Sequence, residues 1–100
     1  MKYYHATSLD AWKGIETDQL LKTGCDGVVY LAETAQNAIQ FVTLRLLNEP
    51  IIVIEVEVPD DKMSHIEESF DHSYAFFQCR AWTYDENIPY SWVTSALMYA

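Results

Sequence analysis

The sequence predicts an α+β domain with a compact mixed sheet and two short helices. Two observations lead to this class. Apolar residues recur at helical spacing in two segments, which begin after Ser8 and after Thr34. Short runs rich in valine, isoleucine and aromatic residues lie before, between and after these segments, and this composition is typical of strands. Half of the 100 residues are apolar, so residues 1–100 are expected to form a single domain around one core.

The N-terminal segment is expected to be a short strand, residues 2–5, followed by a helix. Ser8 suits the N-cap of this helix, because its hydroxyl can accept a backbone N–H that the first turn leaves unpaired. Gly14 weakens the helix and marks a point at which it could end. The apolar residues on its face are Leu9, Trp12 and Ile15, with Leu20 and Leu21 extending the apolar surface.

The middle of the chain is expected to be a strand, a helix and a second strand. Residues 28–32 are a short apolar run after a turn that contains two glycines, which indicates a buried strand. Thr34 can cap a helix over residues 35–47, and Pro50 ends it because the residue before a proline avoids the helical region. In residues 51–58 apolar side chains alternate with glutamates in the second half, so one face is buried and the other is solvated.

The last third of the sequence has weaker patterns. Residues 63–73 are polar and predict no particular element. Residues 73–83 are rich in aromatic and β-favouring residues, so one or two strands are expected there. A turn is expected at residues 85–87, and residues 88–99 are expected to be a final strand or an irregular edge.

The charge of the chain excludes some functions. Fifteen acidic residues against six basic ones give a formal net charge of −9. Direct binding to duplex DNA is not expected, because phosphate contacts come mainly from lysine and arginine. A charge of this sign keeps a small protein soluble, and it can also attract a basic protein partner.

The sequence lacks a membrane span, a signal peptide and a metal-binding cysteine pattern. No apolar run has the length of a membrane span, and the N-terminus does not resemble a signal peptide, so no membrane association is expected. Cys25 and Cys79 match no metal-ligand spacing and are too few for a network of disulfides. We therefore expect reduced thiols, a cytoplasmic protein and no metal site.

Two segments in the first third carry candidate ligand-binding residues. His5, followed by Thr7 and Ser8, can form a hydrogen bond to a ligand hydroxyl through a ring nitrogen. Tyr30 can stack its ring on a planar ligand. The structural alternatives are a histidine that only supports the fold and a tyrosine that belongs to the core.

Two further candidates come later in the chain. Arg45 can form a bidentate contact with a phosphate, although a solvated arginine near the end of a helix is the alternative. On a strand, Gln78 and Arg80 would share one face and Cys79 would lie on the other. The face of Gln78 and Arg80 is directed either to a site or to water. Two acidic pairs are expected to be solvated, Glu55 with Glu57 and Asp60 with Asp61.

The order of these segments resembles the ADP-ribosyltransferase superfamily, and most of all the C-terminal catalytic lobe of RNA 2′-phosphotransferases. The resemblance covers nearly the whole chain, although each motif is short. The matching stretches are Tyr4-His5-Ala6-Thr7-Ser8, Val29-Tyr30-Leu31-Ala32, Glu33-Thr34-Ala35, the strand after Pro50 with Met63 following it, Phe76-Phe77-Gln78, and Ile88-Pro89-Tyr90-Ser91-Trp92-Val93.

This resemblance implies that NAD is bound as a substrate and that ADP-ribose is transferred to a protein or nucleic-acid acceptor. It implies a cofactor-binding set in which His5 binds a ribose hydroxyl and Tyr30 stacks on the nicotinamide ring. The other members would be the backbone of Ala6 at the nicotinamide amide, Thr7 or Ser8 at the ribose, Leu31 beside Tyr30, and Arg45 at a phosphate.

One departure from the family concerns catalysis. Many members use a glutamate at the start of a late strand, and the matching stretch here is Gln78-Cys79-Arg80. Gln78, Arg80 or the nearby Glu86 would then have to replace that glutamate. The alternative is a catalytically inactive protein of the same fold that acts as an acidic binding or inhibitor protein, for example of phage or mobile-element origin.

Overall fold

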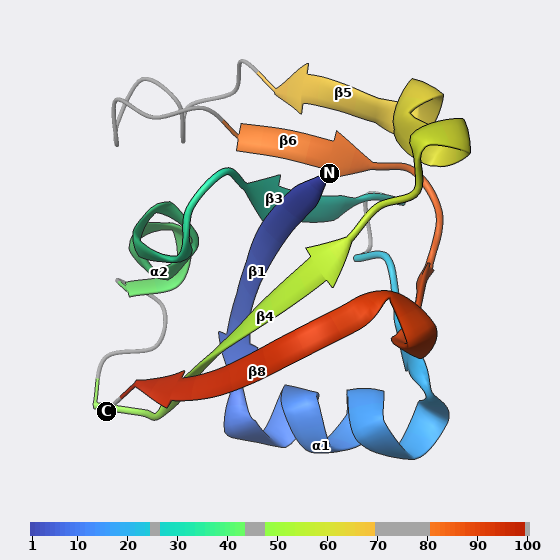
Figure 1. Cartoon of the computed structure of the whole chain (residues 1–100). Helices are drawn as coiled ribbons and strands as arrows, with labels where there is room; N and C mark the ends of the chain where they lie inside the picture. Colours follow the sequence, from blue (N-terminus) through green and yellow to red (C-terminus); the bar gives the residue numbers. More distant parts are fainter. Residues whose placement is uncertain (25–26, 44–47, 70–80, 100) are drawn as a thin grey trace.

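The chain folds into a six-stranded antiparallel sheet with an α-helix on each face, which confirms the α+β class and the two short α-helices (Figure 1). The computed structural model describes residues 1–24, 27–43, 48–69 and 81–99. The elements in these ranges are β1 (Lys2–Ser8), α1 (Leu9–Asp18), β2 (Leu20–Leu21), β3 (Val29–Ala32), α2 (Ala35–Thr43), β4 (Ile51–Glu57), the 3-10 helix η1 (Asp60–His65), β5 (Ile66–Ser69), β6 (Ala81–Tyr84), β7 (Ile88–Pro89), the 3-10 helix η2 (Tyr90–Trp92) and β8 (Val93–Tyr99).

The sheet is built around β1 and β4. Its strand order is β5-β6-β3-β1-β4-β8, and β2 pairs with β7 in a separate two-stranded sheet. All seven residues of β1 are in register with β4, from Lys2 opposite Glu57 to Ser8 opposite Ile51. This pairing extends β1 beyond the predicted residues 2–5. By contrast, β1 and β3 are in register at one position, Tyr4 opposite Ala32.

Two hydrophobic clusters lie on opposite faces of the sheet, because successive residues of a strand point to opposite sides. The larger cluster joins Ile15 of α1 and Leu21 of β2 to alternate residues of β3 and β4, including Leu31 and Ile54. The smaller cluster joins α2 to the other face. Its buried members are Ala6, Ala32, Ala38, Val42 and Val53.

Both predicted helix caps are present. The backbone N–H of Ala11 donates to Ser8 Oγ at 3.1 Å, and that of Asn37 donates to Thr34 Oγ1 at the same distance. The described part of the second helix ends at Thr43, and residues 44–47 of the predicted range lie outside the described residues.

The prediction that α1 could end at Gly14 is wrong. The helix continues to Asp18, and Gln19 then adopts a left-handed conformation with φ 58° and donates its backbone N–H to the carbonyl of Ile15. Burial of Ile15 in the core offsets the roughly 1 kcal/mol that a glycine costs inside a helix. Leu20 and Leu21 follow the helix in β2, which pairs with β7. Leu21 extends the apolar surface as expected, because it is buried in the same cluster as Ile15.

The elements of the C-terminal third differ from those expected from its weak sequence pattern. Residues 63–73, for which no particular element was predicted, contain the last three residues of η1 and all of β5 in their described part. Residues 88–99 contain β7, η2 and β8 in succession, with β8 as one edge of the large sheet. Within the described residues, no helix is both long enough and apolar enough to cross a membrane.

Glu55 is held by a polar cluster on the sheet and is not simply solvated as expected. Its carboxylate accepts hydrogen bonds from Thr94 Oγ1 at 2.6 Å and Tyr4 OH at 3.0 Å, and Lys2 Nζ lies 3.6 Å away. Its side chain is 22 % exposed. The hydrogen bond from Thr94, then that from Tyr4, lowers the pKa of Glu55 below its ordinary value.

We predict that Glu55 makes the stability of the fold fall in acid. Because its pKa is lower in the folded chain than in the unfolded chain, its contribution is complete above the ordinary glutamate pKa of 4.5. The contribution is lost as the pH falls from there through the lowered folded pKa. Urea unfolding between pH 3 and 7 should show a shallower acid loss in Glu55→Gln than in the wild type. Parallel pH profiles would contradict this prediction.

Candidate functional site: a pocket between β1 and α1

A pocket of about 240 Å³ lies where β1 leads into α1, beside β2. It contains two residues of the predicted site, His5 and Thr7, which project from the same side of β1. The residues that line it are His5, Thr7, Ala11, Gly14, Ile15, Asp18, Leu20, Leu21 and Lys22.

The ring of His5 is held by a hydrogen bond to the neighbouring strand. Its Nδ1 lies 2.7 Å from the backbone carbonyl oxygen of Tyr30. A carbonyl oxygen can only accept, so Nδ1 carries the proton and donates it. In the neutral imidazole, Nε2 is then an acceptor on the opposite side of the ring. β1 and β3 are in register at one residue pair, Tyr4 opposite Ala32. The hydrogen bond from the His5 side chain to the Tyr30 carbonyl joins the two strands next to that pair.

The other members of the predicted N-terminal stretch have different surroundings. Thr7 lines the pocket. Ser8 Oγ accepts the N-cap hydrogen bond of α1. The side chain of Ala6 is buried on the opposite face against α2, so the role predicted for Ala6 stays a prediction about its backbone alone.

Tyr30 and Leu31 alternate along β3 and therefore point to opposite faces. The side chain of Leu31 is 0 % exposed within the larger core cluster, so it supports the site by packing and does not reach a ligand as expected. Tyr30 is 38 % exposed, which contradicts the alternative that it is an ordinary core residue. Its carbonyl contributes to the pocket through His5, and its ring is not among the lining groups.

The other seven residues that line the pocket were not predicted as site residues, and Asp18, Lys22 and Gly14 are among them. Asp18 and Lys22 form an ion pair at 3.1 Å on the exposed rim, and nothing in the sequence marks either residue as part of a site. A carboxylate can accept hydrogen bonds from ribose hydroxyls, as it does in dinucleotide-binding folds. At Gly14, an added Cβ would meet nothing within 4 Å, so the absence of a side chain keeps this wall of the pocket open.

The remaining predicted residues do not line this pocket or lie outside the described residues. Glu86 is in the turn between β6 and β7, where its Oε2 accepts a hydrogen bond from Tyr84 OH at 3.4 Å. It is not among the residues that line the pocket with His5. The predicted residues that lie outside the described ranges are Arg45, Gln78 and Arg80, together with Cys25 and Cys79.

The fold and the pocket thus define a small α+β domain with a small hollow between its first strand and first helix. No protein-family model and no curated protein matches the chain. Among solved structures, the chain is similar to Protein CC0527 from Caulobacter crescentus, with a TM-score of 0.69 and 14 % identity over 98 % of this chain and 85 % of that one.

A second structure of CC0527, a double mutant with two methionine substitutions, matches with a TM-score of 0.68 and 14 % identity over the same shares of both chains. At this level of identity the likeness shows the fold alone. The function of the pocket therefore has to be argued from its own side chains.

Proposed function

We propose that the chain binds NAD in the pocket between β1 and α1 and transfers ADP-ribose from it to a protein or nucleic-acid acceptor. The observation that carries this proposal is the hydrogen bond from His5 Nδ1 to the Tyr30 carbonyl, in a ring that lines the pocket beside Thr7. This bond presents Nε2 as an acceptor for a ribose hydroxyl. The hydroxyl of Thr7 can both donate and accept, which suits a second sugar hydroxyl.

The size of the pocket suits a part of NAD better than the whole dinucleotide. Ligand pockets commonly measure about 300–1,000 Å³. A hollow of about 240 Å³ suits one nucleoside half of the dinucleotide, with the rest of the ligand lying outside it. Asp18 and Lys22 on the rim add a carboxylate for ribose hydroxyls and a cation for phosphate.

Transfer of ADP-ribose needs few reactive groups from the protein. The acceptor atom forms a bond to C1′ of the ribose while the glycosidic bond to nicotinamide breaks. Nicotinamide leaves with the bonding electrons and becomes neutral, and the acceptor loses a proton. The ribose becomes positively charged in the transition state, so positioning and a nearby negative charge accelerate the step. Among the described lining residues, Asp18 supplies such a charge.

Two substitutions of Gly14 test whether NAD occupies this pocket. Gly14→Ala should stabilise α1 by about 0.5–1 kcal/mol and leave room for the ligand. Gly14→Leu should also fold, because its Cβ enters open space, but the larger side chain should fill the pocket. We expect NAD to raise the melting temperature of the wild type and of Gly14→Ala, and to have little effect on Gly14→Leu.

Nicotinamide release, measured with the same three proteins and a cell lysate as the source of acceptors, tests the transfer step. Release by the wild type and Gly14→Ala, but not by Gly14→Leu, is the expected result. Absence of any melting-temperature shift with NAD, or an equal shift in all three proteins, would contradict the proposal.

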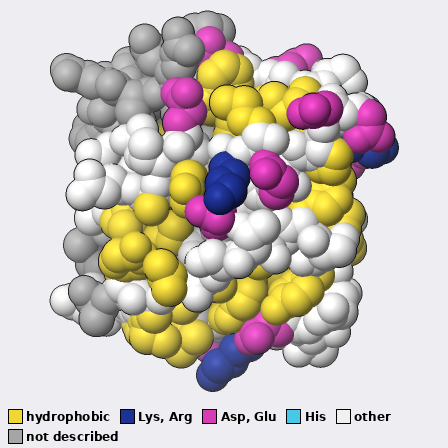
Figure 2. Space-filling model, viewed as in Figure 1, with side chains coloured by type: hydrophobic (Ala, Val, Ile, Leu, Met, Phe, Trp, Pro, Cys, Tyr) yellow, Lys and Arg dark blue, Asp and Glu magenta, His cyan; other side chains and the backbone are white. Residues whose placement is uncertain are grey.

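A second candidate is an inactive protein of this fold that binds a basic partner, and the distribution of charge favours it. The lysines of the described residues include Lys2, beside Glu55, and Lys22, beside Asp18. Figure 2 shows the basic groups of one face next to acidic groups, so little of that surface is positive. NAD binding without nicotinamide release, together with capture of a basic protein that is lost at high salt, would support this candidate.

A further inference from the structure

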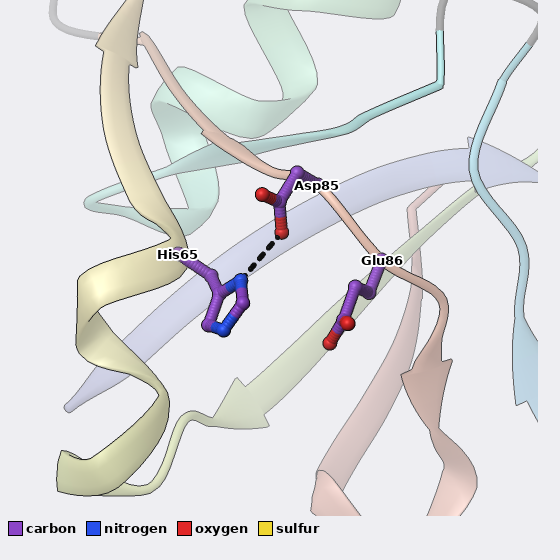
Figure 3. A group of neighbouring side chains, drawn as sticks. All are labelled: His65, Asp85 and Glu86. Carbon is purple, nitrogen blue, oxygen red and sulfur yellow. Dashed lines mark hydrogen bonds and ion pairs between the residues drawn. The ribbon is translucent and has the colours of Figure 1, made fainter.

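Three side chains that bind metals in other proteins converge at the edge of the sheet formed by β5 and β6. His65 ends η1, and Asp85 and Glu86 follow β6 in the turn that leads to β7. Each offers one nitrogen or oxygen atom, and these atoms all lie within 4.8 Å of one another. Figure 3 shows the three side chains directed toward a shared space, with His65 Nδ1 2.9 Å from Asp85 Oδ1.

Tyr84 supports this group from the core. Its side chain is only 1 % exposed, and its ring centroid lies 5.9 Å from that of His65. Its hydroxyl donates a hydrogen bond to Glu86 Oε2 at 3.4 Å. A buried phenol that contacts both a potential ligand ring and a potential ligand carboxylate is the kind of outer support that orients metal ligands.

The donor set selects a class of ion. One imidazole nitrogen and two carboxylate oxygens suit divalent first-row transition metals such as Mn²⁺ and Zn²⁺, whereas Ca²⁺ takes six to eight oxygen ligands. Metal–ligand bonds of about 2.0–2.2 Å place two ligand atoms on opposite sides of an ion at most roughly 4.4 Å apart. The ligand atoms of His65, Asp85 and Glu86 lie within 4.8 Å of one another, so small side-chain rotations are enough for all three to reach one ion. Three protein ligands would leave further positions to water.

We propose that His65, Asp85 and Glu86 bind one divalent transition-metal ion. This site is separate from the pocket of His5 and does not depend on the proposed NAD chemistry. The hydrogen bond between His65 and Asp85 is replaced on binding, because both groups then coordinate the ion. The cysteine spacing predicted no metal site, whereas these three ligands contain no cysteine and are brought together by the pairing of β5 with β6.

Mn²⁺ is the suitable probe, because it favours oxygen and nitrogen ligands over thiolates and broadens nearby NMR signals. Substoichiometric Mn²⁺ added to the 15N-labelled chain should selectively broaden the amide signals around His65 and Asp85. His65→Ala and Asp85→Asn should each weaken Mn²⁺ binding about tenfold or more. Asp10→Asn, which makes the same change in charge on α1, should bind like the wild type.

All three substituted residues are at least partly exposed, and the amide spectra of the variants report whether the fold is retained. Broadening spread evenly over acidic surface residues, or unaltered affinity in both His65→Ala and Asp85→Asn, would overturn the proposal. A wild type that shows no selective broadening at saturating Mn²⁺ would also overturn the proposal.

Discussion

His5→Asn is expected to bind NAD about 5- to 150-fold more weakly than the wild type while remaining folded. The side-chain amide of asparagine can replace Nδ1 as the donor to the Tyr30 carbonyl, but it has no atom at the position of Nε2. A lost hydrogen bond that leaves a ligand hydroxyl without its partner costs about 1–3 kcal/mol, and 1.4 kcal/mol corresponds to tenfold in affinity. Calorimetric titration with NAD measures the change.

His5→Gln is the matched comparison, because its longer side chain places an amide near the position of Nε2. We expect His5→Gln to retain more of the NAD affinity and to lose more stability, since the bond to Tyr30 is weakened. If both variants bound NAD as tightly as the wild type, His5 would have only a structural role.

Leu31→Ala is expected to lower the free energy of unfolding by about 2–5 kcal/mol. Leu31 is completely buried among the residues that join β3 to β4 and α1, so truncation leaves a cavity. For a domain whose total stability is about 5–15 kcal/mol, a loss of this size is a large part of the total and shifts the unfolding midpoint clearly. Urea or thermal unfolding followed by circular dichroism measures it.

Leu31→Met conserves the volume of the side chain and should cost less than about 1.5 kcal/mol. NAD affinity should be unchanged in Leu31→Met, because the side chain faces the core and not the pocket. A variant that kept its stability but lost NAD binding would restore Leu31 to the set of ligand-contacting residues.

The parts of the fold that the sequence predicts well are those with local causes. Ser8 and Thr34 cap helices through their own hydroxyls. The alternation of Ile54 and Val56 with Glu55 correctly indicates a strand, although the face of Glu55 is also covered, because Val53 is buried there against α2. The end of α1 was not predicted correctly because it depends on contacts with other parts of the chain. Ile15 is buried by other elements, and a glycine in a helix gives no sign of that packing.

The candidate site was only partly predictable for the same reason. His5 and Thr7 are adjacent to a recognisable helix cap, and they do line one pocket. Asp18 and Lys22 resemble an ordinary surface ion pair in the sequence, and only the return of the chain through β2 makes them part of the pocket rim. Leu31 was assigned to the site because it follows Tyr30, but strand alternation directs it into the core.

A crystal structure of the chain grown with NAD is the direct test of nucleotide binding between β1 and α1. A ribose of NAD is expected in the pocket between β1 and α1, with one hydroxyl within hydrogen-bond distance of His5 Nε2 and the Nδ1 bond to Tyr30 retained. The result that would contradict it is NAD bound elsewhere on the chain, or a pocket that stays free of nucleotide at saturating NAD.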